Sequence, residues 1–147
     1  MSPIPLSDED TRVIFSDEAM DRLGRLEGSQ QKQLLRRLLS ILKAETPPSA
    51  HLHERIQNLD IIAAGDTIRL YTKVVENIPR GNTRYHIINV FYIDEGHDYL
   101  QRKLATYNTA AQERADRITS LVDIDDVEAY LERMNALDAA DLQDLLE

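Results

Sequence analysis

The spacing of apolar residues changes several times along the chain, and each change predicts a new element. Residues 13–15 form a short apolar run that is typical of a strand. Ser16 follows at once and offers a hydroxyl cap, while Asp17 and Glu18 bring negative charge into the first turn, where it suits the helix dipole. The pattern therefore predicts a strand that runs directly into a helix, which ends near Gly28.

A broad stripe of leucines predicts a second helix. Ser29 can cap this helix, and Pro47 and Pro48 end it because proline does not continue a helix. The stripe consists of Leu34, Leu35, Leu38, Leu39 and Leu42. Two helices joined so closely predict an antiparallel helical hairpin.

After the hairpin, the period changes from helical to alternating. Residues 67–75 alternate between apolar and polar side chains, which predicts a half-buried strand with Arg69, Tyr71 and Lys73 on its polar face. Residues 84–93 are rich in β-branched and aromatic side chains, which is typical of a central strand.

Turn-forming residues separate the predicted strands. Residues 79–82 form a turn, and residues 94–98 form a hairpin connection to a last strand over residues 99–107. The order β-α-α-β-β-β predicts an α+β fold, with the helical hairpin packed on a small antiparallel sheet. Two alternatives remain for the strand face that meets the leucines: Tyr85, Ile87, Phe91 and Ile93, or Ile88 and Val90.

The C-terminal part of the chain is helical in pattern and strongly acidic. Residues 121–147 contain nine acidic residues and one arginine, so they hold −8 of the net charge of −9. We therefore divide the chain into an N-terminal arm at 1–11, a domain at 12–120 and an acidic helical extension at 121–147. Because the acidity belongs to the extension, the net charge does not exclude a nucleic-acid partner for the domain.

Composition narrows the class of protein further. The chain has no cysteine, so neither a disulfide nor a thiolate metal site is expected. His51 and His53 are only two ligands, and we expect neither a metal nor another cofactor. The N-terminus has no pattern of a signal peptide, and no apolar run reaches the roughly 20 residues that cross a bilayer. We expect a cytoplasmic protein without a membrane partner.

Several phrases of the sequence resemble the RelE/ParE superfamily of toxin–antitoxin systems. The first strand and helix correspond to VIFSDEAMDRLGRL, the second strand to TIRLYTKV, and the third and fourth strands to RYHIINVFYIDEGHDYLQRKLATYN. The resemblance covers about residues 12–118. It implies either a RelE-type protein, a metal-independent endoribonuclease that cuts mRNA in the ribosomal A site, or a ParE-type protein that targets DNA gyrase.

The resemblance also places the candidate catalytic residues on one face of the sheet and at the end of the last strand. There, Arg69 and Lys73 are expected to stabilise phosphate charge, while His86 or Tyr107 moves a proton. The residues expected to bind RNA are Arg69, Tyr71, Lys73, Arg84, Arg114 and Arg117. The expected partners are the ribosome or mRNA and an antitoxin protein, and a homodimer is a further alternative.

Two departures from the family pattern keep a second function open. Tyr107 to Ala110 stand where a glycine followed by basic residues is frequent, and the loop from Glu76 to Thr83 is long. The polar side chains of the strands could also simply solvate an exposed face. The alternatives are thus a translation inhibitor that binds the ribosome and cleaves mRNA, and a non-catalytic ParE-like or regulatory interaction protein. In the second case the acidic extension would cover the basic sheet face.

Overall fold

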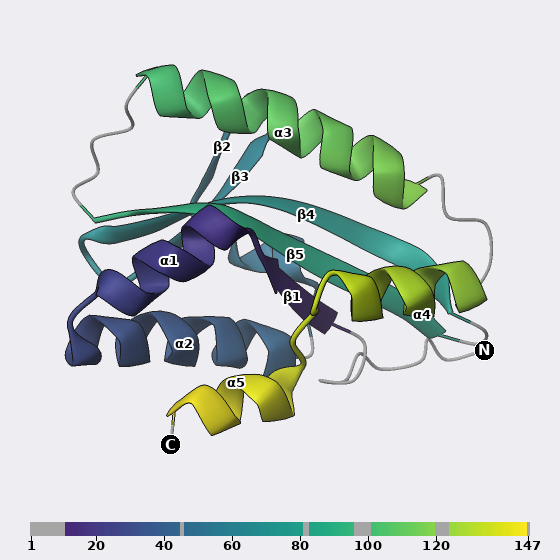
Figure 1. The fold of residues 1–147 in the computed structure, drawn as a ribbon, viewed down its shortest axis with the longest axis horizontal. Helices are drawn as coiled ribbons and strands as arrows, with labels where there is room; N and C mark the ends of the chain where they lie inside the picture. The colour runs from purple at the N-terminus through teal and green to yellow at the C-terminus, as the bar shows by residue number, and fades with distance from the viewer. Residues whose placement is uncertain (1–10, 45, 81–82, 96–100, 120–123, 147) are drawn as a thin grey trace.

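The computed structural model describes residues 11–44, 46–80, 83–95, 101–119 and 124–146. They form an α+β fold in which one five-stranded sheet, in the order β1-β5-β4-β3-β2, lies between helices (Figure 1). The strands are β1 (Thr11–Phe15), β2 (Glu54–Ile56), β3 (Leu59–Ala64), β4 (Ile68–Arg80) and β5 (Thr83–Asp94). The helices are α1 (Asp17–Arg25), α2 (Gly28–Lys43), α3 (Gln101–Thr119), α4 (Ile124–Arg133) and α5 (Ala139–Leu146), with a 3-10 turn at Pro48–His51.

The predicted helical hairpin is present, and its first cap is the predicted one. The Ser16 side chain accepts a hydrogen bond from the Ala19 backbone N–H over 3.1 Å. The cap of the second helix was predicted at Ser29 and is wrong by two residues. Glu27 is the N-cap, and it exchanges hydrogen bonds with Gln30 in a capping box.

The sheet is mixed, so the prediction of a purely antiparallel sheet is wrong for one pair of strands. β1 runs parallel to β5, with Val13 opposite Ile88, while all other pairs are antiparallel. The helical hairpin and three strands separate β1 from β5 in the sequence. No tight turn therefore forces these two strands to run in opposite directions.

The hairpin side of the sheet holds the larger core. Leucines of α2 pack there against Ile88, Val90 and Ile93 of β5, together with Leu142 of α5. The face of Ile88 and Val90 is therefore the one that meets the leucines, whereas Ile87 points to the other side. Ile93 faces the same side because β5 has a bulge at Phe91. Tyr71 pairs with Tyr92 and Thr72 pairs with Val90, so Phe91 has no partner in β4. This extra residue shifts the alternation of side chains by one position, which turns Ile93 toward the leucines.

Helices α3 and α4 cover the opposite face of the sheet, and Figure 1 shows α3 on the other side of the sheet from α2 and α5. Tyr107 and Ala111 of α3 pack against Tyr71 and Phe91. Val127, Tyr130 and Leu131 of α4 pack against the other end of the same face. The sheet is thus buried on both sides, which the sequence pattern did not predict.

The last predicted strand, residues 99–107, is wrong because α3 begins at Gln101. Leu104, Tyr107, Ala111 and Ile118 recur at intervals of three, four and seven residues, and this spacing puts them on one helical face toward the sheet. Strands β2 and β3 were not predicted. Leu59 to Ala64 form a short, almost wholly buried strand, and buried strands do not alternate between apolar and polar residues.

The acidic extension contributes to both cores. Val13 N donates to Leu137 O over 2.9 Å, and Leu137 N donates to Val13 O over 2.7 Å, so the segment between α4 and α5 pairs with the outer edge of β1. No helix in the described part of the chain is long and apolar enough to cross a membrane. Residues 1–10 of the predicted arm, the turn residues 81–82 and residues 96–98 of the predicted connection lie outside the described residues.

Candidate functional site

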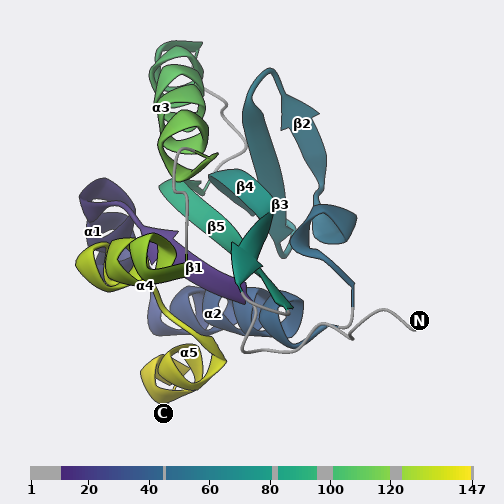
Figure 2. The same cartoon turned by 90° about the vertical axis from the view of Figure 1, so that its right-hand side faces the viewer.

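The prediction that Arg69 and Tyr71 lie on a solvated strand face is wrong. Arg69 is only 6% exposed, and its Nη1 donates to the carbonyl oxygens of Gly65 and Ile68, each at 2.9 Å. Tyr71 is fully buried, and its hydroxyl donates to Asp94 Oδ2 over 2.7 Å. Both side chains are thus occupied by the protein's own groups, and α3, which lies along one side of the sheet (Figure 2), packs against Tyr71.

Lys73 and His86 project from opposite faces of the sheet. Side chains alternate along a strand, and Val74, the neighbour of Lys73, packs on the hairpin side. Lys73 therefore belongs to the face of α3 and α4, where it is half-buried. His86 shares the face of Ile88 on the hairpin side and is 2% exposed. The structure does not bring these two candidate catalytic residues together.

Tyr107 joins α3 to α1 instead of lying at the end of a strand. Its ring stacks at 5.4 Å from Tyr92 and 6.3 Å from Phe91, and the residue is 6% exposed. Burial, followed by a hydrogen bond to the Glu18 carboxylate and the charge of that group, raises the pKa of Tyr107 above its ordinary value. A phenol with a raised pKa is a poorer proton donor to a leaving group.

Arg114 and Arg117, two of the predicted RNA-binding residues, line the same hollow between α3 and the end of α4. Its volume is about 400 Å³, and Ala110, Glu113 and Met134 complete its lining. The Arg114 Nη1 donates to the Tyr130 hydroxyl over 3.1 Å and approaches Met134 Sδ at 3.7 Å. Tyr130 is fully buried, so it gives the Arg114 guanidinium a fixed position. The Arg84 side chain lies outside the described side chains.

A second hollow adjoins the first and shares Arg114 and Met134 with it. Its volume is about 500 Å³, and it reaches from α4 to the start of α1. Arg133 is one of its lining residues, and the Arg133 Cζ atom lies 5.7 Å from the centroid of the Tyr130 ring. Its full lining is Phe15, Ser16, Asp17, Met20, Arg114, Arg133, Met134, Asn135 and Leu137. We call the two hollows together the Arg114 groove.

The middle of the Arg114 groove is cationic and apolar at once. Arg114 and Arg133 have no carboxylate within 4 Å in the part of the chain that the structure describes. Asp17 and Glu113 each line one of the two hollows, so the acidic groups are divided between them. Met20 is 44% exposed, which is unusual for a large apolar side chain and leaves it open to a ligand.

Two features of the charged surface were not predicted from the sequence. Arg133 is the single cation of the acidic extension, and nothing in its local sequence set it apart from a solvated residue. Helix α2 contains no acidic residue, and its exposed Lys32, Arg36 and Lys43 follow one stripe over about 16 Å. The absence of an acidic residue from α2 was visible in the sequence and could have indicated this stripe.

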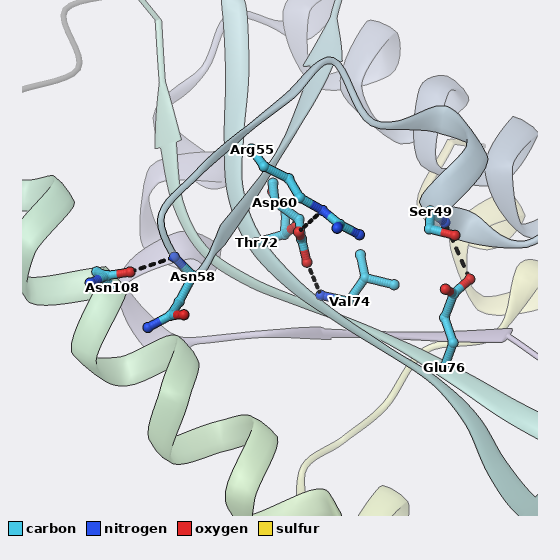
Figure 3. Close-up of polar contacts among 8 residues, drawn as sticks. All are labelled: Ser49, Arg55, Asn58, Asp60, Thr72, Val74, Glu76 and Asn108. Atoms are coloured by element: carbon cyan, nitrogen blue, oxygen red, sulfur yellow. Dashed lines mark hydrogen bonds and ion pairs between the residues drawn. The ribbon is translucent and has the colours of Figure 1, made fainter.

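A further polar cluster supports the edge of the sheet (Figure 3). Asp60 is 3% exposed, its Oδ2 accepts from Val74 N over 2.9 Å, and its Oδ1 pairs with Arg55 Nε at 3.0 Å. The pairing of β3 with β4 ends at Asp60 and Thr72, so Val74 has no backbone partner in β3. The Asp60 carboxylate accepts the Val74 N–H hydrogen bond instead. On the other side of β3, the Asn108 side chain accepts from Asn58 N over 2.7 Å and ties the turn between β2 and β3 to α3.

Metal ligands do not gather in the described part of the chain, where no group of three His, Asp or Glu residues could hold an ion. His51 Nε2 lies 2.7 Å from the Thr46 hydroxyl, and His53 is exposed. No family model, no curated protein and no solved structure matches the chain.

Proposed function

We propose that this chain is a non-catalytic binding protein of RelE/ParE-like type and not a ribonuclease. One observation carries the proposal: Lys73 and His86 project from opposite faces of the sheet, and helices cover both faces. A single phosphodiester cannot contact both residues. Proton transfer and charge stabilisation at one phosphate need groups within hydrogen-bond reach of the same atoms.

The other candidate catalytic residues support the same proposal. The guanidinium of Arg69 already binds two main-chain oxygens, and the pKa of Tyr107 is raised by burial and by Glu18. Moving either residue to a bound RNA would break buried hydrogen bonds, which costs about 1–3 kcal/mol for each group left unsatisfied. These side chains contribute to stability and not to chemistry.

The RelE/ParE-like part of the proposal rests on the resemblance together with the order of elements. β1, α1 and α2 are followed by the antiparallel strands β4 and β5, which correspond to the second and third strands that the resemblance implies. The chain departs from that pattern in two ways: β2 and β3 are additional strands, and α3 occupies the place of the last expected strand. A binding protein of this type acts by occupying its target, which the resemblance implies to be the ribosome or DNA gyrase.

A reconstituted translation reaction with a defined mRNA tests the proposal. Primer extension should show no new 5′ ends at saturating protein, whether or not translation slows. Cuts that depend on both the protein and the ribosome, and that disappear in Lys73→Ala, would overturn the non-catalytic assignment. A supercoiling assay with purified gyrase, run in parallel, separates the two targets. Inhibition of neither process would defeat the RelE/ParE-like part of the proposal.

A further inference from the structure

We propose that the Arg114 groove binds an acidic peptide segment of a partner protein, with an apolar side chain as its anchor. This inference rests on the proposed function, because it names the surface and the partner chemistry of a protein that binds without catalysis. The groove is formed by α3, α4 and the start of α1. His86 and Tyr107, the candidate residues for proton transfer, do not line it.

The charge of the groove selects an anionic occupant. Arg114 and Arg133 both contact Tyr130: Arg114 donates a hydrogen bond to its hydroxyl, and the Arg133 guanidinium lies over its ring. Neither has a carboxylate partner among the described residues. Arginine at such a position recognises carboxylates by paired hydrogen bonds. The carboxylates of an occupant therefore belong near the middle of the groove.

The apolar lining selects an occupant that is not only anionic. Met20, Met134, Phe15 and Leu137 line the larger hollow around Arg114. Methionine side chains are flexible and polarisable and adapt to apolar groups of varied shape. A nucleic-acid backbone offers phosphates but no aliphatic side chain for this surface, whereas an acidic peptide offers both carboxylates and aliphatic side chains. This mixture favours a peptide over RNA.

The shape of the groove favours an extended ligand. Two hollows of about 400 and 500 Å³ adjoin each other and share Arg114 and Met134. A compact small molecule would fill one hollow, while a peptide can pass over the shared residues and occupy both. Asp17 and Glu113, one in each hollow, disfavour further acidic residues beside them, so the acidic residues of the peptide are expected at its centre.

The experiment uses the full chain and a fluorescent synthetic peptide, about 12 residues long, with alternating glutamate and leucine at its centre and serine at both ends. Fluorescence anisotropy should show saturable binding that weakens as salt is raised. Arg133→Ala should weaken binding about tenfold. Arg133 is exposed and makes no side-chain hydrogen bond among the described residues, so the variant should keep nearly the same melting temperature. Arg36→Ala, which removes an exposed arginine from α2, is the matched control and should bind as the wild type does.

Two further changes test the apolar part and the direction of charge. Met20→Gln should weaken binding of the same peptide, and replacement of the peptide's leucines by serine should abolish it. Arg133→Glu should reverse the preference, so that a peptide with lysine in place of glutamate binds better than the acidic one. Chemical shifts of backbone amides on addition of the peptide should change at Asp17, Arg114 and Asn135 and not along α2.

Several results would overturn the inference. Equal losses in Arg133→Ala and Arg36→Ala would indicate only non-specific attraction, and so would equal binding of the serine-substituted peptide. Tighter binding of a single-stranded oligouridine that competes with the peptide would assign the groove to RNA. A doubled mass that falls on addition of the peptide would assign it to a second copy of this chain. A wild type that cuts mRNA but still binds the peptide would defeat the proposed function and leave the groove intact.

Discussion

Val13 and Leu137 exchange both of their backbone hydrogen bonds, at 2.9 and 2.7 Å, so the C-terminal segment is paired with the edge strand of the sheet. The helices on either side of Leu137 pack on different faces of the sheet, since Tyr130 of α4 belongs to one core and Leu142 of α5 to the other. The acidic extension therefore closes the outer edge of β1 and completes both layers of the domain.

Removal of residues 124–147 should unfold the domain. The truncation deletes Val127, Tyr130, Leu131 and Leu142 from the two cores, and each large buried side chain contributes about 2–5 kcal/mol. Their sum matches the whole stability of a typical domain, about 5–15 kcal/mol. Circular dichroism should show loss of a cooperative thermal transition. A truncated chain that melts at the same temperature and gains affinity for RNA would instead support an extension that merely covers a basic face.

Tyr130→Ala gives the same test without a truncation. It should lower the free energy of unfolding by about 3–5 kcal/mol, because a fully buried aromatic ring is lost and the hydrogen bond from Arg114 with it. Leu145→Ala is the control, since Leu145 is 51% exposed and should change the free energy by less than about 0.5 kcal/mol. Urea unfolding of both variants measures the difference.

Asp60→Ala should destabilise the fold far more than Arg55→Ala, although the two side chains form one ion pair. Removing the buried Asp60 carboxylate leaves the Val74 N–H without its acceptor, at a cost of about 1–3 kcal/mol. The Arg55 side chain is 66% exposed, and such a surface partner contributes about 0–1 kcal/mol. Asp60→Asn keeps one side-chain oxygen that can accept the Val74 N–H hydrogen bond, so its loss of stability should lie between those of the two alanine variants. Equal losses in the two alanine variants would mean that the ion pair, and not the contact with β4, matters.

Tyr107 should make the stability of the protein fall at alkaline pH. Its pKa is raised in the folded chain above its value of about 10 in the unfolded chain, so the folded state keeps a proton that the unfolded state loses. The stabilisation is complete below about pH 10 and is lost as the pH rises toward the folded pKa. Tyr107→Phe should therefore flatten the loss of stability above pH 10 in urea titrations. Glu18→Gln should reduce the slope as well, because its charge helps to raise that pKa. An unchanged slope in both variants would contradict the assignment.

His86→Ala and Lys73→Ala should differ in stability and agree in activity. His86 is 2% exposed on the hairpin side, so His86→Ala should lower the free energy of unfolding by about 1–3 kcal/mol. Lys73 is half-buried, so Lys73→Ala should lower it by less than about 1 kcal/mol. Neither variant should change the rate at which the protein affects translation, because neither residue acts in catalysis. Similar stability losses in the two variants would contradict the difference in burial between His86 and Lys73.

The local pattern of the sequence was sufficient to predict those elements that depend on contacts between residues close together in the chain. Ser16 caps α1 by accepting a hydrogen bond from Ala19, only three residues further along the chain. The leucines of α2 define one helical face by their spacing alone. The strand pattern around Ile88 was recognised for the same reason, since alternation is a property of consecutive residues. The identity of the face could be stated only as two alternatives, because a bulge at Phe91 depends on the partner strand.

The candidate site depended on contacts that no local pattern contains. Arg69 and Tyr71 look solvated in the sequence because they alternate with apolar residues, yet both are buried, and Tyr71 packs against Tyr107 of α3, more than thirty residues away in the chain. Arg133 and Arg114 lie on different helices and come together only at Tyr130. The sequence by itself therefore determined the helical hairpin, the two central strands and the unequal distribution of charge. The tertiary structure alone decided the parallel pairing of β1 with β5, the burial of both sheet faces and the groove at Arg114, because each requires residues distant in sequence to share one desolvated surface.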